Sequence, residues 1–331
     1  MGDCMAKSKP KNINGLMKYL RDQKGMDING SSQKLRLRNM GYYHGYKGYR
    51  YIGTPSKTIN FAKFAELESV YNFDKKLKAL LYPHVMFIET ALKNYVLEAL
   101  IDNSKSENFN EIYNTLLTDY KRFATTNKNK YKTALKKRLG LRDQIYRVQT
   151  KAYGNKNRIA EHYYQKDNSL PIWAIFELLS LGKFGNFVAC IESNTRRDIS
   201  LRLGIKQSDD SHAMLTERLI FTIKDLRNAI AHNDVIFDAR FRNGSIDNQV
   251  INAVTNATGV KGITFETIVD YIILIVYMLD LFGLKKTEIR KFVREFEIIK
   301  EDLRKEIPTS YYNQIIHSNV NNKLSQVKKF I

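Results

Sequence analysis

The stretch FAKFAELESVYNFDKKLKALLYPHVMFIETALKNYVLEAL, residues 61–100, decides the fold class. Its first apolar residues recur at intervals of three and four, at Phe61, Phe64, Leu67, Val70, Phe73, Leu77 and Leu80. This spacing places them on one side of an α-helix, whereas a half-buried strand would alternate apolar and polar residues. We expect Pro83 to divide the stretch into two helices, because proline lacks the amide hydrogen that a continuing helix uses.

Helical patterns return later in the chain, and no alternating pattern of any length indicates a strand. Apolar helices are predicted at residues 170–180, 211–232, 263–284 and 287–307. Residues 242–262 are rich in Asn, Gly and Ser, and we expect a loop there. The predicted class is all-α.

The chain is basic and has enough apolar residues for a sizeable core. It has 331 residues, 43% of them hydrophobic, and 54 Lys and Arg against 34 Asp and Glu give a formal charge of +20. Such an excess favours a polyanionic partner, either nucleic acid or an acidic membrane surface. A generally soluble basic protein is the alternative.

The cysteines and the apolar segments exclude several classes of protein. Cys4 and Cys190 make no metal-ligand spacing, so we expect no metal, no cofactor and no disulfide framework, in a reducing cytoplasm. Residues 1–14 are polar and lysine-rich, without the apolar core of a signal peptide. The most apolar segment, residues 271–279, is shorter than the roughly 20 residues of a membrane span. We therefore predict a buried helix there, and no membrane partner.

Residues 121–158 hold thirteen basic residues and one acidic residue, Asp143, for a net charge of +12. Aromatic residues are interleaved with these cations, which suits phosphate contact combined with base stacking. We therefore expect RNA or DNA to contact this segment, and a solvated helical face is the alternative. The predicted RNA-binding residues are Lys128, Lys130, Tyr131, Lys132, Lys136, Lys137, Arg138, Arg142, Tyr146, Arg147 and Lys151.

The stretch Arg227-Asn-Ala-Ile-Ala-His232 ends a predicted helix and holds the candidate catalytic residues. At about 100° per residue, the apolar residues of this helix form one stripe. Arg227, Asn228 and His232 fall on the side turned away from that stripe. Asn228 and His232 are four residues apart, so their side chains are neighbours.

This trio suits metal-independent cleavage of RNA. His232 can act as general base or acid, Arg227 can neutralise charge on the phosphoryl oxygens, and Asn228 can orient either. The attacking 2′-hydroxyl restricts this chemistry to RNA. The alternative is a polar helix end that is merely solvated, with His232 near the carboxyl-terminal dipole.

Four stretches carry a resemblance to a known family. Leu37-Arg-Asn-Met-Gly-Tyr-Tyr43 with Gly48-Tyr49 is similar to its "NxGYY…GY" signature, and residues 67–89 are similar to its "LYxFDxxLR…IE" helix. Residues 169–182 resemble "LPIWxxxExxSfG", and residues 227–233 resemble "RNxxAHH". The chain thus resembles the Abi family of bacterial phage abortive-infection proteins, of the AbiD/AbiF type, within the HEPN superfamily. It departs from the pattern at His44 and at Asn233, where many relatives have a second histidine.

The resemblance implies a fold, an activity and partners. It implies a HEPN-type helical bundle with an inserted basic helical segment and N- and C-terminal helical extensions. The expected divisions are residues 1–60 with a tyrosine-rich stretch, a core at 61–290 that includes the insertion at 103–168, and a C-terminal helix and tail at 291–331. HEPN sites combine two Arg-x4-His motifs, and the chain has one, so a homodimer or another partner is expected.

The same resemblance implies a bacterial cytoplasmic antiphage toxin associated with a small structured non-coding RNA. That RNA is expected on the basic segment, with Tyr42–Tyr51 as a second candidate contact, although packing inside the protein explains those aromatics equally well. A non-catalytic RNA-binding HEPN scaffold, whose motif only binds phosphate, is the main alternative function. A nucleotidyl- or small-molecule-binding HEPN partner is a third, less favoured because no glycine-rich loop signature is present.

Overall fold

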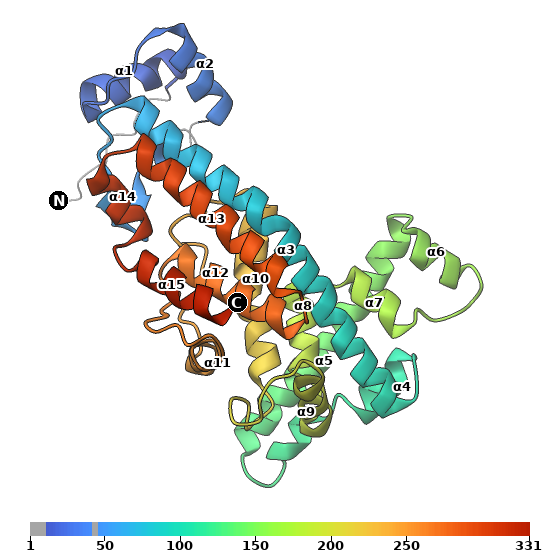
Figure 1. Ribbon diagram of the computed structural model, residues 1–331. Helices are drawn as coiled ribbons and strands as arrows, with labels where there is room; N and C mark the ends of the chain where they lie inside the picture. Colours follow the sequence, from blue (N-terminus) through green and yellow to red (C-terminus); the bar gives the residue numbers. More distant parts are fainter. Residues whose placement is uncertain (1–10, 42–45) are drawn as a thin grey trace, which may run out of the picture.

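The computed structural model describes residues 11–41 and 46–331, in which all elements but one short hairpin are helical (Figure 1). The longest helix, α3 at Phe64–Ser104, has 41 residues and crosses most of the molecule. Its buried residues include Leu67, Leu77, Leu92 and Val96, which repeat at helical spacing along its whole length. The predicted all-α class is confirmed.

Pro83 lies inside α3, so the predicted division into two helices is wrong. An interior proline costs a helix about 3 kcal/mol. Leu81 and Val85, on either side of Pro83, are fully buried, and burial of side chains of this size contributes about 1.5–3 kcal/mol each. Helix α13, Lys286–Glu306, packs along α3 and covers that apolar face. Tertiary packing therefore offsets the lost hydrogen bond, and the helix continues.

The centre of the molecule holds α10, Leu215–Ala231, and α12, Ile268–Leu281, behind the α3–α13 pair (Figure 1). Every residue of α12 from Ile268 to Leu279 is buried, which confirms the predicted buried helix. Within residues 11–41 and 46–331, no helix has the length and apolar character that a membrane crossing requires.

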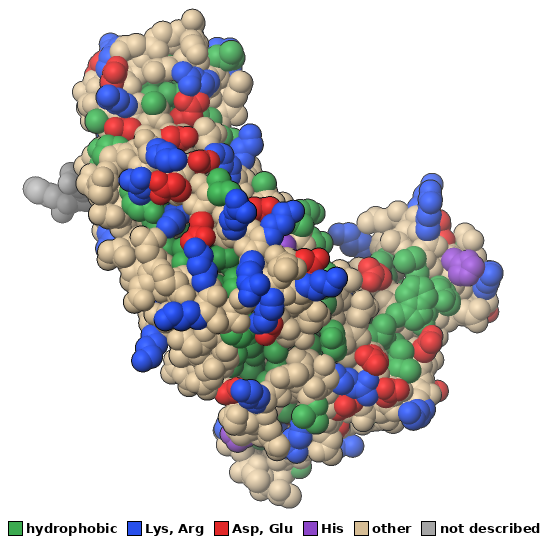
Figure 2. All heavy atoms as spheres, viewed as in Figure 1, with side chains coloured by type: hydrophobic (Ala, Val, Ile, Leu, Met, Phe, Trp, Pro, Cys, Tyr) green, Lys and Arg blue, Asp and Glu red, His purple; other side chains and the backbone are tan. Residues whose placement is uncertain are grey.

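The predicted basic insertion is helical and forms a lobe with the elements that follow it. The lobe occupies the bottom and the right-hand side of Figure 1, and the surface between its α6–α7 part and the α3–α13 pair is indented in Figure 2. The elements of the lobe are α4 (Phe109–Thr115), the 3-10 helix η2 (Asp119–Phe123), α5 (Lys128–Gly154), α6 (Arg158–Tyr164) and α7 (Ile172–Leu178). Two further helices, α8 (Leu181–Val188) and α9 (Ser193–Arg202), lead back to α10.

The two ends of the chain add smaller elements to this core. The N-terminal elements are α1 (Ile13–Lys24), α2 (Gly30–Met40) and an antiparallel hairpin of β1 (Tyr51–Ile52) and β2 (Thr54–Thr58). Helix α11, Asn248–Thr258, replaces part of the loop expected at 242–262. Where a tail was expected, α14 (Thr309–Ile316) and α15 (Val320–Phe330) follow α13, and Lys323 of α15 pairs with buried Asp270 at 2.5 Å.

The aromatic residues of the tyrosine-rich stretch are partly accounted for by packing. Tyr46 and Tyr49 are buried, and the Tyr49 ring stacks on Phe237 with centroids 5.9 Å apart. Tyr42 and Tyr43 lie outside the described residues.

Candidate functional site

Arg227 is fixed by a buried carboxylate on the neighbouring long helix. Its Nε donates to Oε2 of Glu89 in α3 at 2.8 Å, and its Nη1 donates to Oδ1 of Asn228 at 3.3 Å. Glu89 is only 4% exposed and also pairs with Lys93 at 3.0 Å. The Arg227 side chain is 23% exposed, so the rest of its guanidinium group can still meet a phosphate. A bridged guanidinium of this kind is held in one orientation before any ligand arrives.

Asn228 and His232 lie at the same helix end as Arg227. Asn228 lines an open pocket of about 380 Å³, together with Asp225, Asp234, Arg240 and Asn243. His232 follows the last helical residue and is exposed. The structure therefore brings Arg227 and Asn228 into contact. Within the described part of the chain, no hydrogen bond joins the His232 side chain to either of them.

The end of α10 is built by a specific turn. Asp234 N donates to Ala229 O at 2.8 Å and Asn233 N donates to Ile230 O at 3.2 Å, the two bonds of a Schellman motif. Asn233 takes the left-handed conformation that the motif requires, with φ of 57°, and asparagine and histidine adopt it more readily than most residues. Asn233, where the chain departs from the family pattern, is therefore compatible with this turn.

The segment after this turn is anchored by Asp74, a fully buried carboxylate of α3. Its Oδ1 accepts from the backbone N–H groups of Ile236 and Phe237 at 2.8 and 2.9 Å. Its Oδ2 accepts from the Tyr49 hydroxyl at 3.0 Å and pairs with Lys78 at 2.8 Å. Asp74 thus joins the tyrosine-rich stretch, α3 and the chain that follows His232.

Sequence reasoning missed Asp74 and Glu89 as parts of the site, although a signal for both was present. Each acid lies next to the apolar stripe of α3, directly after Phe73 or Ile88, and each has a lysine four residues later. An acid in phase with a buried face, followed by such a lysine, indicates a buried partner rather than a solvated surface.

The predicted RNA-binding residues all lie on α5, and most of them are exposed. Tyr131 and Arg138 are the partly buried ones. Arg138 donates to the backbone oxygens of Leu117 and Tyr113 at 2.7 and 2.8 Å, so it ties α5 to the chain before it. The Tyr131 ring packs edge-on against Tyr120, with centroids 5.5 Å apart. The exposed residues are Lys128, Lys130, Lys132, Lys136, Lys137, Arg142, Tyr146, Arg147 and Lys151.

Comparison with known proteins gives one family. The model of the family described as Abi-like protein matches residues 36–238. No curated protein matches the chain, and no solved structure does. The matched range contains α3, the basic segment and the end of α10.

Proposed function

Because the chain belongs to the Abi-like protein family, we propose that it acts in phage abortive infection as a metal-independent endoribonuclease. Its chemistry would lie at Arg227, Asn228 and His232. The observation that carries the proposal is the 2.8 Å bond from Arg227 to buried Glu89. That bond orients a guanidinium beside Asn228, on the helix end where His232 is exposed.

The proposed reaction is transfer of the phosphodiester to the neighbouring ribose oxygen. The 2′-oxygen attacks phosphorus, the bond to the 5′-oxygen breaks, and a 2′,3′-cyclic phosphate and a 5′-hydroxyl result. His232 takes the proton from the 2′-hydroxyl or gives one to the departing oxygen. Arg227 stabilises the charge on the non-bridging oxygens, and Asn228 holds the phosphate or the imidazole.

A complete site would need two copies of the motif, as the HEPN resemblance implies. The chain has one Arg-x4-His, so the active form would be a homodimer that brings two α10 ends together. The exposed cations of α5 would hold a small structured non-coding RNA or the substrate, through phosphate contacts. Solution mass at micromolar concentration tests the dimer, and a strict monomer that still cuts RNA refutes it.

Cleavage of an unstructured RNA in the presence of a chelator tests the catalytic assignment. Arg227→Ala and His232→Ala are expected to lose cutting while they keep RNA binding. His212→Ala, at another exposed histidine, is the matched control and keeps cutting. An RNA with a 2′-deoxy residue at the cleavage position is expected to resist.

The same assay decides between catalysis and the alternative, a non-catalytic RNA-binding scaffold whose motif only binds phosphate. If the wild-type dimer binds RNA without cutting it, and Arg227→Ala weakens binding, the scaffold function is correct.

Sequencing of the RNA that co-purifies with the protein identifies the bound RNA. One discrete species indicates a dedicated partner RNA, and heterogeneous fragments indicate substrate.

A further inference from the structure

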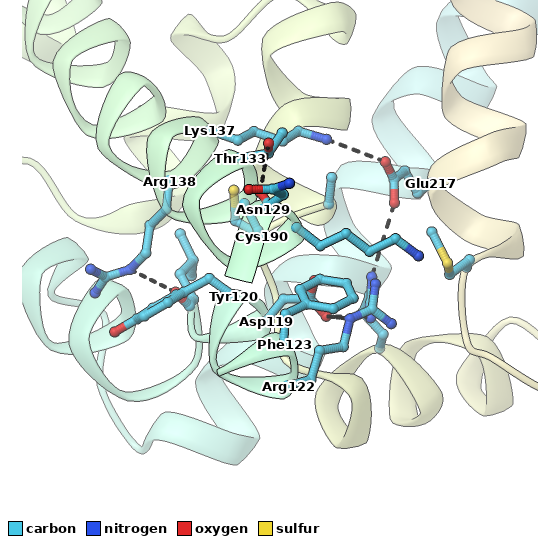
Figure 3. Close-up of a pocket in the computed structure, with 16 residues that line it drawn as sticks. Asp119, Tyr120, Arg122, Phe123, Asn129, Thr133, Lys137, Arg138, Cys190 and Glu217 are labelled. Carbon is cyan, nitrogen blue, oxygen red and sulfur yellow. Dashed lines mark hydrogen bonds and ion pairs between the residues drawn. The ribbon is translucent and has the colours of Figure 1, made fainter. Parts of the chain in front are cut away.

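A pocket of about 370 Å³ lies between the basic segment and the start of α10, away from Arg227 (Figure 3). Its walls come from η2, α5, the chain after α8, α9 and the first turn of α10. Glu217 in this pocket and Arg227 are ten residues apart on α10, or about 15 Å at 1.5 Å per residue. The volume falls within the range of small-molecule sites, roughly 300–1,000 Å³.

One buried cation in this pocket has two nitrogens without a hydrogen-bond partner among the described residues. Arg196 of α9 is 2% exposed, and its Nη2 donates to Asp119 at 2.7 Å. Its Nε and Nη1 are buried without a hydrogen bond among the described residues, and Nη1 lies 4.0 Å from Glu217. Buried guanidinium donors are normally satisfied, so these two nitrogens, with three N–H groups between them, point to an anionic group that enters the pocket.

The other charged groups of the pocket are arranged around Arg196. Lys137 of α5 points toward Glu217, with Nζ 3.5 Å from the carboxylate (Figure 3). Arg122 pairs with Asp119 at 3.2 Å. Five cations and two acids line the pocket, an excess that favours an anion: the cations are Arg122, Lys130, Lys137, Arg138 and Arg196.

Asn129, Thr133 and Cys190 add two polar side chains and a thiol to the lining. The remaining walls are apolar or aromatic, and they limit what the anion is attached to. They are formed by Leu117, Tyr120, Phe123, Ala134, Ala189 and Met214. A bare inorganic ion would leave these walls uncovered, whereas a flat ring would contact them. Aromatic side chains beside cations are the usual means of holding a base together with its phosphate.

We propose that this pocket binds a nucleoside phosphate, with the phosphate on Arg196 and Lys137 and the base against Tyr120 and Phe123. Glu217 accepts a hydrogen bond from a ribose hydroxyl or a base amino group. The nucleotide is either a free one or the 5′-phosphorylated end of an RNA lying on α5. The site needs no glycine-rich loop because side-chain cations hold the phosphate. This proposal does not depend on the proposed cleavage function.

Calorimetric titration of the full chain with ribonucleoside monophosphates tests this proposal. At least one of the four is expected to bind at least tenfold more tightly than its nucleoside and than inorganic phosphate. Two 2′-O-methyl RNA decamers, one with a 5′-phosphate and one with a 5′-hydroxyl, show whether the natural ligand is a free nucleotide or the 5′ end of an RNA. Tenfold tighter binding of the phosphorylated decamer, displaced by the monophosphate, identifies an RNA end. Equal binding of the two decamers identifies a free nucleotide.

Four variants link the binding to the pocket. Lys137→Ala and Arg196→Lys are expected to weaken binding at least tenfold, and Thr133→Trp is expected to abolish it, because Thr133 is an exposed wall residue whose enlargement fills the space. Lys206→Ala, at an exposed lysine outside both the pocket and the basic segment, leaves binding unchanged. The proposal fails if no monophosphate and no phosphorylated decamer binds in the pocket. It also fails if Lys206→Ala weakens binding as much as Lys137→Ala.

Discussion

Replacement of Asp74 tests the claim that one carboxylate holds the chain after His232. Asp74→Ala removes the acceptor of two buried backbone N–H groups, at Ile236 and Phe237, and of the Tyr49 hydroxyl. A buried donor left without an acceptor costs about 1–3 kcal/mol. Loss of one partner of a buried ion pair costs about 3–5 kcal/mol. Lys78 is 13% exposed and can turn to water, which reduces the cost of the broken ion pair. The donors left without an acceptor then contribute most of the loss. We expect Asp74→Ala to lower the free energy of unfolding by about 3–5 kcal/mol.

Two milder variants separate acceptor geometry from charge. Asp74→Asn keeps an oxygen for the two backbone N–H groups and loses the ion pair to Lys78, so a loss of about 1–2 kcal/mol is expected. Tyr49→Phe removes one hydrogen bond, and about 1 kcal/mol is expected. Urea unfolding followed by circular dichroism measures all three, provided that the denaturant slope stays constant. If Asp74→Asn is as damaging as Asp74→Ala, charge rather than the paired acceptors holds the segment, and the reasoning is wrong.

Three further predictions concern other parts of the molecule. Glu89→Gln releases Arg227 from its fixed orientation, and RNA cleavage is expected to fall about 10–100-fold with RNA binding kept. Replacement of Lys128, Lys132 and Lys136 by Gln is expected to reduce the slope of log affinity against log salt by about 2, since each lost phosphate contact to a single strand contributes about 0.7. Burial raises the pKa of the Cys190 thiol from its ordinary 9.0 to about 11, so in a Cys4→Ser background its reaction with Ellman's reagent at pH 8 is expected to be about 100-fold slower than that of a free thiol. The stability that the protonated thiol contributes is fully present below pH 9 and is lost as the pH rises through about 11, and Cys190→Ala removes this dependence.

Each of these predictions has a control or an outcome that contradicts it. Glu98→Gln changes an exposed acid on the same helix and should leave cleavage intact, whereas equal losses would mean that Glu89 has no special role. Three exposed cations of α13 can be replaced in the same way, and an equal change in salt slope would place the RNA elsewhere: Lys291, Arg294 and Lys305. Rapid modification of Cys190 in the folded protein would contradict its burial.

The fold class was predictable because the apolar residues of α3, α10 and α12 repeat at helical intervals, and this signal is local. Pro83 shows where local reasoning fails: its cost is intrinsic to the sequence, but the packing of α13 that offsets it lies some 200 residues away in the chain. Helix α11 was missed for a related reason. Its Asn-rich composition favours a loop, yet Asp247 caps its first turn and Val250 and Val254 are buried by neighbours.

Spacing along one helix predicts that the candidate residues lie near one another, but it does not predict the residues that support them. Arg227 and Asn228 are adjacent in the last turns of α10 and His232 directly follows the helix, so their proximity follows from helix geometry. The contact between Arg227 and Glu89 joins residues 138 positions apart, and spacing within either helix does not encode it. The pocket around Arg196 is likewise assembled from five segments of the chain, and no sequence motif predicts it.

The family match ends at residue 238, but the face of α3 that the match includes is covered by helices beyond that point. α13 lies along α3, and α12 is buried behind it. A fragment cut at residue 238 would therefore expose a long apolar surface to water and is expected to aggregate. The boundary of shared sequence is not a boundary of folding. Relatives that diverge after this position must still supply some apolar cover for α3, whether from their own chain or from a partner.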